Sequence, residues 1–147
     1  MIPLALVTGF LGSGKTTLLK RIAERANDRQ YLFLVNEFAA VDTDARRLTG
    51  GEQPVISIVG GSIFCVCKVT EFTRALQDVA ARVADVEQFD GVIVEASGIA
   101  DPRVVRRMLR ECELDDRYEL RSVIAVVDPG SFEKLLKTLP NIRGQIE

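Results

Sequence analysis

The chain has 147 residues, a formal net charge of −2 at pH 7, and a composition that is 47% hydrophobic and 27% charged. Its length allows one hydrophobic core, so we expect a single domain, and its slight acidity argues against nucleic-acid binding, which needs a basic face. Because no apolar run approaches the roughly 18 residues of a membrane span and no signal peptide precedes the first expected strand, we expect a cytoplasmic protein that binds no membrane.

Short apolar segments alternate with amphipathic segments along the chain. We expect strands at residues 2–8, 31–35, 55–59, 91–95 and 122–127. We expect helices from about residue 16 to about residue 27, over 72–86, after Pro102 and over 131–139. Strands that are nearly all apolar and separated by helices imply an α/β fold, with a mostly parallel sheet covered by helices on both faces. Ligands of such sheets bind beyond the carboxyl ends of the strands.

The first expected strand is followed directly by GFLGSGKTT, residues 9–17, which fits the phosphate-loop (Walker A) pattern G-x-x-x-x-G-K-[ST]. Glycines there allow successive backbone N–H groups to point at phosphate oxygens, and the following helix adds the positive end of its dipole. Lys15 is expected to reach the β- and γ-phosphates, and the Thr16 hydroxyl to hold Mg²⁺. The alternative is a chance glycine turn, which the flanking strand and helix disfavour. We therefore expect a P-loop NTPase with nucleotide contacts from Gly9, Gly12, Ser13, Gly14, Lys15, Thr16 and Thr17.

A second segment at the same edge of the sheet is DGVIVEASGIADP, residues 90–102. Glu95 ends the fourth expected strand, and Gly98 follows three residues later. A carboxylate at this position can bind Mg²⁺ directly or through water, and the Gly98 N–H can contact the γ-phosphate. Alone, the segment also fits a strand that ends in a turn. The phosphate loop favours the nucleotide-binding interpretation.

Three segments, residues 9–17, 36–44 and 95–102, resemble in sequence and order the motifs of the CobW-type GTPases. These GTPases are relatives of the nickel and cobalamin-enzyme accessory GTPases that serve as metal chaperones. The family pattern is roughly GFLGaGKTT, NEFGEVGID and EssGLADP, and this chain has GFLGSGKTT, NEFAAVDTD and EASGIADP. Ala39 and Ala40 replace the family's Gly and Glu, which removes one carboxylate. The resemblance covers nearly the whole chain.

The resemblance implies a protein that binds GTP or GDP with Mg²⁺ and hydrolyses GTP slowly, with water as the nucleophile. Lys15 and Thr16 would hold phosphate and Mg²⁺. Glu37 and Asp44 would belong to a first switch segment, and Glu95 to Gly98 would form a second, with Glu37 and Glu95 supporting Mg²⁺. Nucleotide state would then change the affinity for a metal or for a metalloenzyme or cofactor-protein client. Whether the protein forms a homodimer stays open.

A departure from the family lies in GGSIFCVCKVT, residues 60–70, where the family usually has G-C-x-C-C after a glycine pair and binds zinc or a similar ion. This chain retains Cys65 and has Cys67 as a shifted partner. Three cysteines and no histidine mean that any zinc or cobalt site must use Cys, Asp or Glu. By the resemblance, Glu37 could be a third ligand. The alternative is two buried cysteines that act as small apolar residues, which is also the role expected for Cys112.

GTPases of this kind read guanine with N-K-x-D, and no such tetrapeptide occurs in the chain. In the family this motif follows a further strand, so we expect residues 1–147 to be a GTPase domain that is truncated before its last strand and lacks a small C-terminal domain. Two other functions stay open. One is a nucleotide-gated accessory protein of a corrinoid or other cofactor enzyme, without its own metal site. The other is a small-molecule P-loop kinase, which the lack of a lid insertion disfavours.

A basic cluster lies on one side of the helix expected after Pro102 and comprises Arg103, Arg106, Arg107 and Arg110. The first interpretation is a solvated face whose arginines pair with neighbouring acids. The alternative is a docking surface for an acidic partner.

Overall fold

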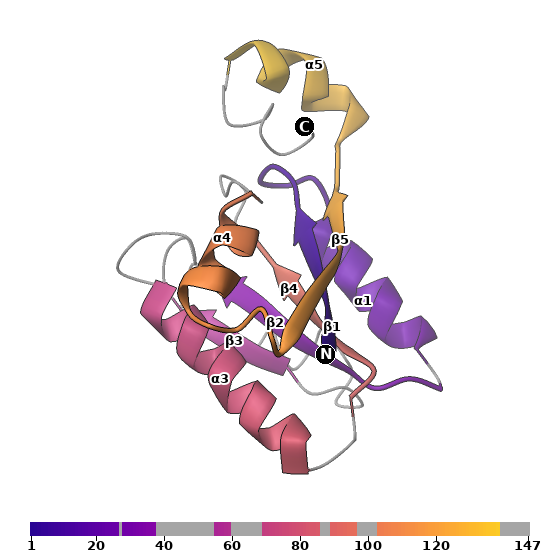
Figure 1. Ribbon diagram of the computed structural model, residues 1–147. Coiled ribbons are helices and arrows are strands. Elements are labelled where there is room, and N and C mark those ends of the chain that lie inside the picture. The colour runs from indigo at the N-terminus through magenta and orange to yellow at the C-terminus, as the bar shows by residue number, and fades with distance from the viewer. Residues whose placement is uncertain (27, 38–54, 60–68, 86–88, 97–102, 139–147) are drawn as a thin grey trace.

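The computed structural model describes residues 1–26, 28–37, 55–59, 69–85, 89–96 and 103–138. Five parallel strands form one sheet in the order β3-β2-β4-β1-β5 (Figure 1). The strands are β1 (Ile2–Thr8), β2 (Tyr31–Glu37), β3 (Val55–Val59), β4 (Gly91–Glu95) and β5 (Tyr118–Ala125). The helices are α1 (Lys15–Arg25), α3 (Val69–Asp85), α4 (Arg103–Glu111) and α5 (Pro129–Thr138).

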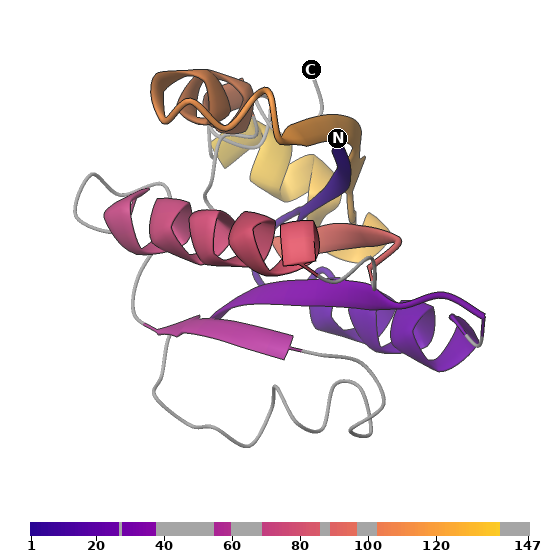
Figure 2. The same ribbon diagram turned by 60° about the horizontal axis from the view of Figure 1, so that its bottom comes forward.

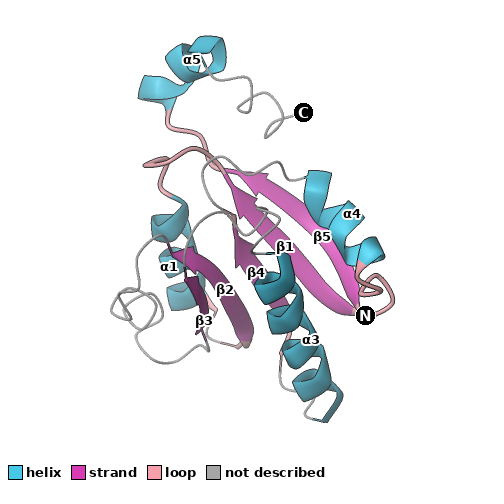
Figure 3. Cartoon of the chain, turned by 90° about the vertical axis from the view of Figure 1, so that its left-hand side faces the viewer, coloured by secondary structure: helices cyan, strands magenta, loops and turns pink. Residues whose placement is uncertain are grey.

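Helices cover both faces of the sheet, as the sequence predicted (Figures 1 and 3). Alternate strand residues point to opposite faces. Leu4 and Leu6 of β1 face a core that α3 and α4 complete, with Phe72 and Leu76 fully buried in it. Val7 belongs to a second core on the other face, which α1 covers with Leu19 and Ala23. Figure 2 shows α3 and α1 on opposite sides of the sheet. Among the described helices, none is both long and apolar enough to cross a membrane.

The predicted strands at 2–8, 55–59 and 91–95 are confirmed at those bounds. The bounds predicted for the fifth strand, 122–127, are wrong, because β5 runs from Tyr118 to Ala125. The added residues are not a continuous apolar run: Glu119 and Arg121 form an ion pair of 2.8 Å. An edge strand tolerates such polar side chains because one of its sides meets solvent, so apolar content alone misplaced its start.

Helix α4 has the amphipathic form expected after Pro102. Its arginine side is exposed at Arg106, Arg107 and Arg110. Arg107 Nε donates to Glu111 Oε1 at 2.6 Å, which confirms for this arginine the predicted pairing with a neighbouring acid. Arg106 and Arg110 form no ion pair with a described residue. The opposite side buries Val105, Met108 and Leu109 in the α3–α4 core.

One buried hydrogen bond ties the start of β5 to α3. The Tyr118 hydroxyl donates to the Leu76 carbonyl oxygen at 2.6 Å, and the Tyr118 side chain is 2% exposed. Burial raises the pKa of Tyr118, because the interior disfavours the phenolate. The neutral hydroxyl therefore belongs to the folded state.

We expect Tyr118→Phe to lower the free energy of unfolding by about 1 kcal/mol, the net contribution of a typical buried hydrogen bond. Because the folded pKa lies above the unfolded value of about 10, burial of the neutral phenol stabilises fully below that pH. This stabilisation is lost as the pH rises from there toward the folded pKa. Denaturant unfolding between pH 7 and pH 11 measures both effects.

Tyr31→Phe is the matched control, because Tyr31 is the other of the two tyrosines in the chain. Alkaline loss of stability that persists unchanged in Tyr118→Phe and disappears in Tyr31→Phe would contradict the assignment.

Candidate nucleotide-binding site

Two strands deliver the predicted phosphate and Mg²⁺ residues to the same edge of the sheet. Strands β1 and β4 are parallel neighbours, and their register places Val7 opposite Glu95. The Ala96 N–H donates to the Val7 carbonyl at 2.8 Å, so the pairing continues to the end of both strands. The loop that follows Thr8 therefore begins beside the carboxylate that ends β4, as expected for parallel strands.

Three glycines allow the chain to curl between β1 and α1. Gly9, Gly12 and Gly14 have φ angles of 133°, 79° and 98°, a region that residues with a Cβ rarely adopt. The Ser13 N–H donates to the Phe10 carbonyl at 3.1 Å and closes a turn within the loop. Gly14 is the residue before α1, and no side chain caps this helix. The first N–H groups of α1 are thus left for another acceptor, such as a phosphate.

The Lys15 side chain folds back into the curl. Its ammonium Nζ donates to the carbonyl oxygens of Gly9 at 2.9 Å and Phe10 at 3.0 Å. Lys15 is only 7% exposed. Burial lowers the pKa of Lys15, and the negative charge of Glu95 acts in the opposite direction. The positive charge is therefore held inside the loop, where a phosphate oxygen could replace the carbonyls as its partner.

Thr16 and Glu95 meet although 79 positions separate them in the sequence. The Thr16 hydroxyl donates to Glu95 Oε1 at 3.4 Å, and Glu95 is 7% exposed. Oxygen atoms are the ligands that Mg²⁺ prefers, and the Thr16 hydroxyl and the Glu95 carboxylate both offer oxygen atoms beside the loop. The donor set therefore fits the predicted Mg²⁺, with Thr16 and Glu95 on the same side of the phosphate loop.

Two buried hydroxyls lie in or beside the loop. Within the described residues, Thr8 Oγ1 and Ser13 Oγ are buried without a hydrogen-bond partner. An unpaired buried hydroxyl is costly, so such groups usually meet water or a ligand. Ser13 and Phe10 line a small cavity of about 20 Å³ between the loop and the β5–α5 connection, which has room for about one water molecule.

The β5–α5 connection forms a second wall of the loop, which the sequence analysis missed. The Val126 N–H donates to the Thr8 carbonyl at 2.8 Å, and Asp128 lines the small cavity. Asp128 accepts hydrogen bonds from Ser131 Oγ at 2.6 Å and Gly130 N at 3.2 Å, and thereby caps α5. The Ser131 hydroxyl, followed by the Gly130 N–H, lowers the pKa of Asp128. The signal for this wall is the helix-start pattern Asp-Pro at 128–129.

The roles of the other predicted site residues stay predictions. Glu37 ends β2, the parallel neighbour of β4, and its backbone pairs with Val59. Asp44, Gly98, Cys65 and Cys67 lie outside the described residues. Within the ranges that are described, no three Cys, Asp or Glu side chains gather as a metal site would require. Thr17 is exposed in the first turn of α1, and Cys112 is a half-buried free thiol 3.4 Å from the Thr73 hydroxyl.

Comparisons with known proteins agree with this geometry. A family model described as "CobW/HypB/UreG, nucleotide-binding domain" matches residues 3–146. The zinc chaperone YjiA of Escherichia coli strain K12 is 34% identical over 147 residues, which cover 99% of this chain and 46% of YjiA. The zinc chaperone CobW of Pseudomonas aeruginosa is 30% identical over 136 residues, which cover 86% of this chain and 35% of that protein. The chain thus spans less than half the length of these curated relatives.

Solved structures share the fold. A Zn(II)-bound triple mutant of the YjiA GTPase has a TM-score of 0.69 at 26% identity and covers 99% of this chain and 46% of its own. The hydrogenase maturation factor HypB from Archaeoglobus fulgidus has a TM-score of 0.60 at 16% identity, with coverage of 96% and 61%, and is similar in fold alone. The predicted α/β fold of a P-loop NTPase is confirmed.

We expect Gly9→Ala to destabilise the protein by more than about 2 kcal/mol, because the residue must keep a strained backbone and avoid a collision. A Cβ at this position would collide with the Val126 carbonyl oxygen and lie 2.9 Å from Ser13 Oγ. Gly12→Ala is the matched control, because its φ is also positive but no atom lies within 4 Å of a Cβ there. It should cost only about 1 kcal/mol.

Thermal and denaturant unfolding of both variants measure the difference. Equal losses of unfolding free energy in the two variants would show that the Val126 carbonyl oxygen does not exclude a Cβ at position 9.

Proposed function

Because the chain belongs to the CobW/HypB/UreG family of nucleotide-binding domains, we propose that it binds GTP with Mg²⁺ and supports slow GTP hydrolysis in a metallochaperone or metallocofactor-insertion protein. The observation that carries this proposal is the convergence of a buried Lys15 ammonium with the Thr16–Glu95 contact at one glycine loop. This is a phosphate and Mg²⁺ site built from two strands and one helix.

Each described residue has a specific task in this proposal. The backbone N–H groups around Gly14 and the start of α1 would bind phosphate oxygens. Lys15 would exchange its carbonyl partners for oxygens of the transferring phosphoryl group and stabilise the charge that develops there. Thr16 would hold Mg²⁺ and Glu95 would support it directly or through water. The ion, when bound, would neutralise phosphate charge. Water would attack the γ-phosphorus while the bond from that phosphorus to the β–γ bridging oxygen breaks, so that GDP and inorganic phosphate leave.

The switch assignments extend the same site. We propose that Glu37 and Asp44 act in the first switch and that Gly98 contacts the γ-phosphate in the second. Glu95 supports this arrangement, because it lies beside Thr16 and is the first residue of the proposed second switch, Glu95 to Gly98. Loss of the γ-phosphate would change both segments and so the affinity for a client metalloenzyme or cofactor protein.

The third part of the proposal concerns the residues that would bind the guanine base. The chain contains no N-K-x-D tetrapeptide and covers 46% of YjiA. We propose that residues 1–147 are the phosphate-binding part of a GTPase domain, with the base-reading strand supplied by further sequence.

The proposed metal is zinc or a similar ion bound by Cys65 and Cys67, with Glu37 as a third ligand. The names of the relatives support zinc, since YjiA and CobW are zinc chaperones. The competing proposal is a nucleotide-gated accessory protein without its own metal, which the altered cysteine motif favours.

The proposed Mg²⁺ role is tested with a fluorescent GTP analogue titrated with and without Mg²⁺. We expect Mg²⁺ to strengthen binding to the unchanged protein and Glu95→Gln to reduce that gain by about tenfold. Lys15→Ala should weaken binding both with and without Mg²⁺, because it removes a phosphate partner. Hydrolysis, measured as phosphate release, should fall in both variants.

Asp90→Asn is the matched control, a carboxylate-to-amide change just before the other end of β4, where Asp90 accepts a hydrogen bond from the Gln30 N–H. If Glu95→Gln retained the full Mg²⁺ gain, Glu95 would be a structural residue.

The proposed metal site is tested by Co²⁺ absorption of the reduced protein. We expect a thiolate-to-cobalt band that disappears in Cys65→Ser and in Cys67→Ser but persists in Cys112→Ser. Each ligand must be a thiolate, so binding should release protons and weaken as the pH falls. The absence of a band at millimolar Co²⁺, with all thiols reactive, would favour the accessory protein without a metal.

A further inference from the structure

An open groove of about 530 Å³ lies between α1, from Leu18 onward, and the start of β2. Its apolar lining includes Leu18 and Ile22 of α1, which pack on the core beneath that helix, and Tyr31 of β2. All three side chains are half-buried. The groove therefore offers apolar surface to solvent without being part of the core. We call it the α1 groove.

Three arginines and one acid, Asp28, also line the α1 groove. Arg21 and Arg25 are exposed and one turn apart on α1, and neither forms an ion pair with a described residue. Arg29 donates to the Tyr31 hydroxyl at 3.4 Å. The interaction with Tyr31 is the largest cause that raises the pKa of Arg29, and the negative charge of Asp90 raises it further. Arg29 therefore remains charged.

The spacing of these charges is unfavourable for an isolated helix. Like charges four residues apart repel each other, whereas opposite charges at that spacing attract. Helix α4 shows the favourable case, in which Arg107 pairs with Glu111. Arg21 and Arg25 instead place two positive charges together in a chain whose net charge is −2. Three arginines against one acid make the lining of the groove net positive, and no described acid forms an ion pair with Arg21 or Arg25.

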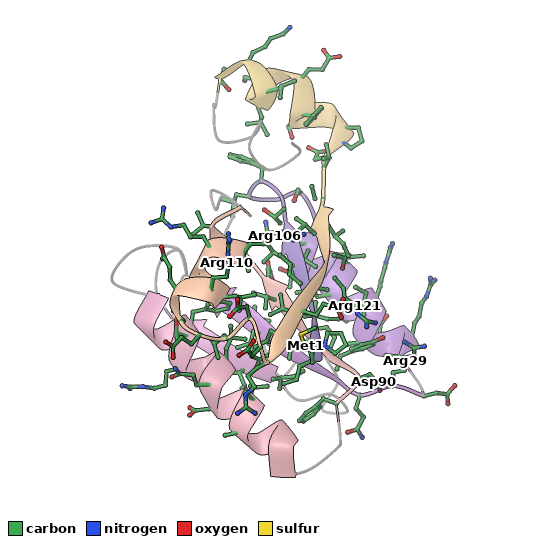
Figure 4. All side chains as sticks on the ribbon, viewed as in Figure 1. Met1, Arg29, Asp90, Arg106, Arg110 and Arg121 are labelled. Atoms are coloured by element: carbon green, nitrogen blue, oxygen red, sulfur yellow. The ribbon has the colours of Figure 1, made fainter. Side chains whose placement is uncertain are left out.

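The α1 groove is separate from the nucleotide site. The phosphate loop meets the N-terminal end of α1, whereas the groove is lined by residues from Leu18 to Arg25 of that helix. Figure 4 shows Arg29 near Asp90 and Met1 at the end of the sheet opposite the phosphate loop, with Arg106 and Arg110 on α4. None of the proposed phosphate or Mg²⁺ contacts uses this surface.

We propose that the α1 groove binds an acidic amphipathic segment of a partner protein, with its carboxylates on Arg21 and Arg25 and its apolar side chains on Leu18 and Ile22. Arginine suits this role because its planar guanidinium can bind a carboxylate through two hydrogen bonds. An apolar lining between the charges suits a peptide, whose side chains alternate in polarity, better than a polyanion. The overall acidity of the chain also disfavours a nucleic acid.

The test is fluorescence anisotropy with a labelled peptide of about 14 residues that is rich in glutamate and carries leucines at helical spacing. We expect saturable binding that weakens with added salt, because exposed charges are screened. Arg21→Glu combined with Arg25→Glu should weaken it by about tenfold or more. The matched control is Arg106→Glu combined with Arg110→Glu, the same charge change on two exposed arginines one turn apart on α4, which should leave the affinity unchanged.

Several results would overturn the proposal. They are equal weakening by the α4 pair, equal binding of a peptide with lysine in place of glutamate, and no saturation at millimolar peptide. Tighter binding of a single-stranded oligonucleotide that depends on Arg21 and Arg25 would assign the groove to nucleic acid instead. Thermal unfolding checks that both double variants fold. Lys15→Ala should bind the peptide normally, so a failure here is independent of the nucleotide proposal.

Discussion

The phosphate loop and the strand ends beside it depend on the burial of one positive charge, the Lys15 ammonium. A buried ammonium is costly unless it is paired and hydrogen-bonded. Here two carbonyl oxygens of the loop accept hydrogen bonds from the ammonium, and the Glu95 carboxylate provides a counter-charge. The carbonyl oxygens reach the ammonium because the loop curls back on itself at Gly9. The charge of the Glu95 carboxylate acts on it because β4 ends beside β1. The buried lysine charge therefore requires both the glycines of the loop and the register of β1 and β4.

The register of β1 and β4 determines which carboxylate reaches the loop. A shift of one residue would turn Glu95 to the other face of the sheet and replace it with an apolar side chain. The register is secured by the two cores, since Leu4 and Leu6 must face α3 and α4 while Val7 faces α1. Packing far from the phosphate loop thus fixes the distance between Thr16 and Glu95. The hydrophobic cores position the site as much as they stabilise the fold.

The sequence predicted those features that depend on local pattern. Apolar runs located β1, β3 and β4, and the fixed spacing from Gly9 to Thr16 located the phosphate loop, because both follow from short-range backbone chemistry. Features made by distant segments were not predictable in this way. The hydrogen bond between Val126 and Thr8, and the early start of β5 at Tyr118, depend on which strand becomes the edge of the sheet. The metal-binding roles of Glu37, Cys65 and Cys67 remain predictions.

The start of α1 shows how the sequence leaves stability unused where a ligand is to bind. Most helices begin with Ser, Thr, Asp or Asn, and an acid in the first turn adds a favourable interaction with the helix dipole. Helix α1 begins after Gly14, has no side-chain cap and carries no acid in its first turn. An acid or a capping oxygen there would compete with a phosphate for the same N–H groups. At the other end, Arg25 lies in the last turn, where a positive charge is favourable. The uncapped end of α1 is therefore the end at the phosphate loop, so a bound phosphate would supply the cap that the sequence omits.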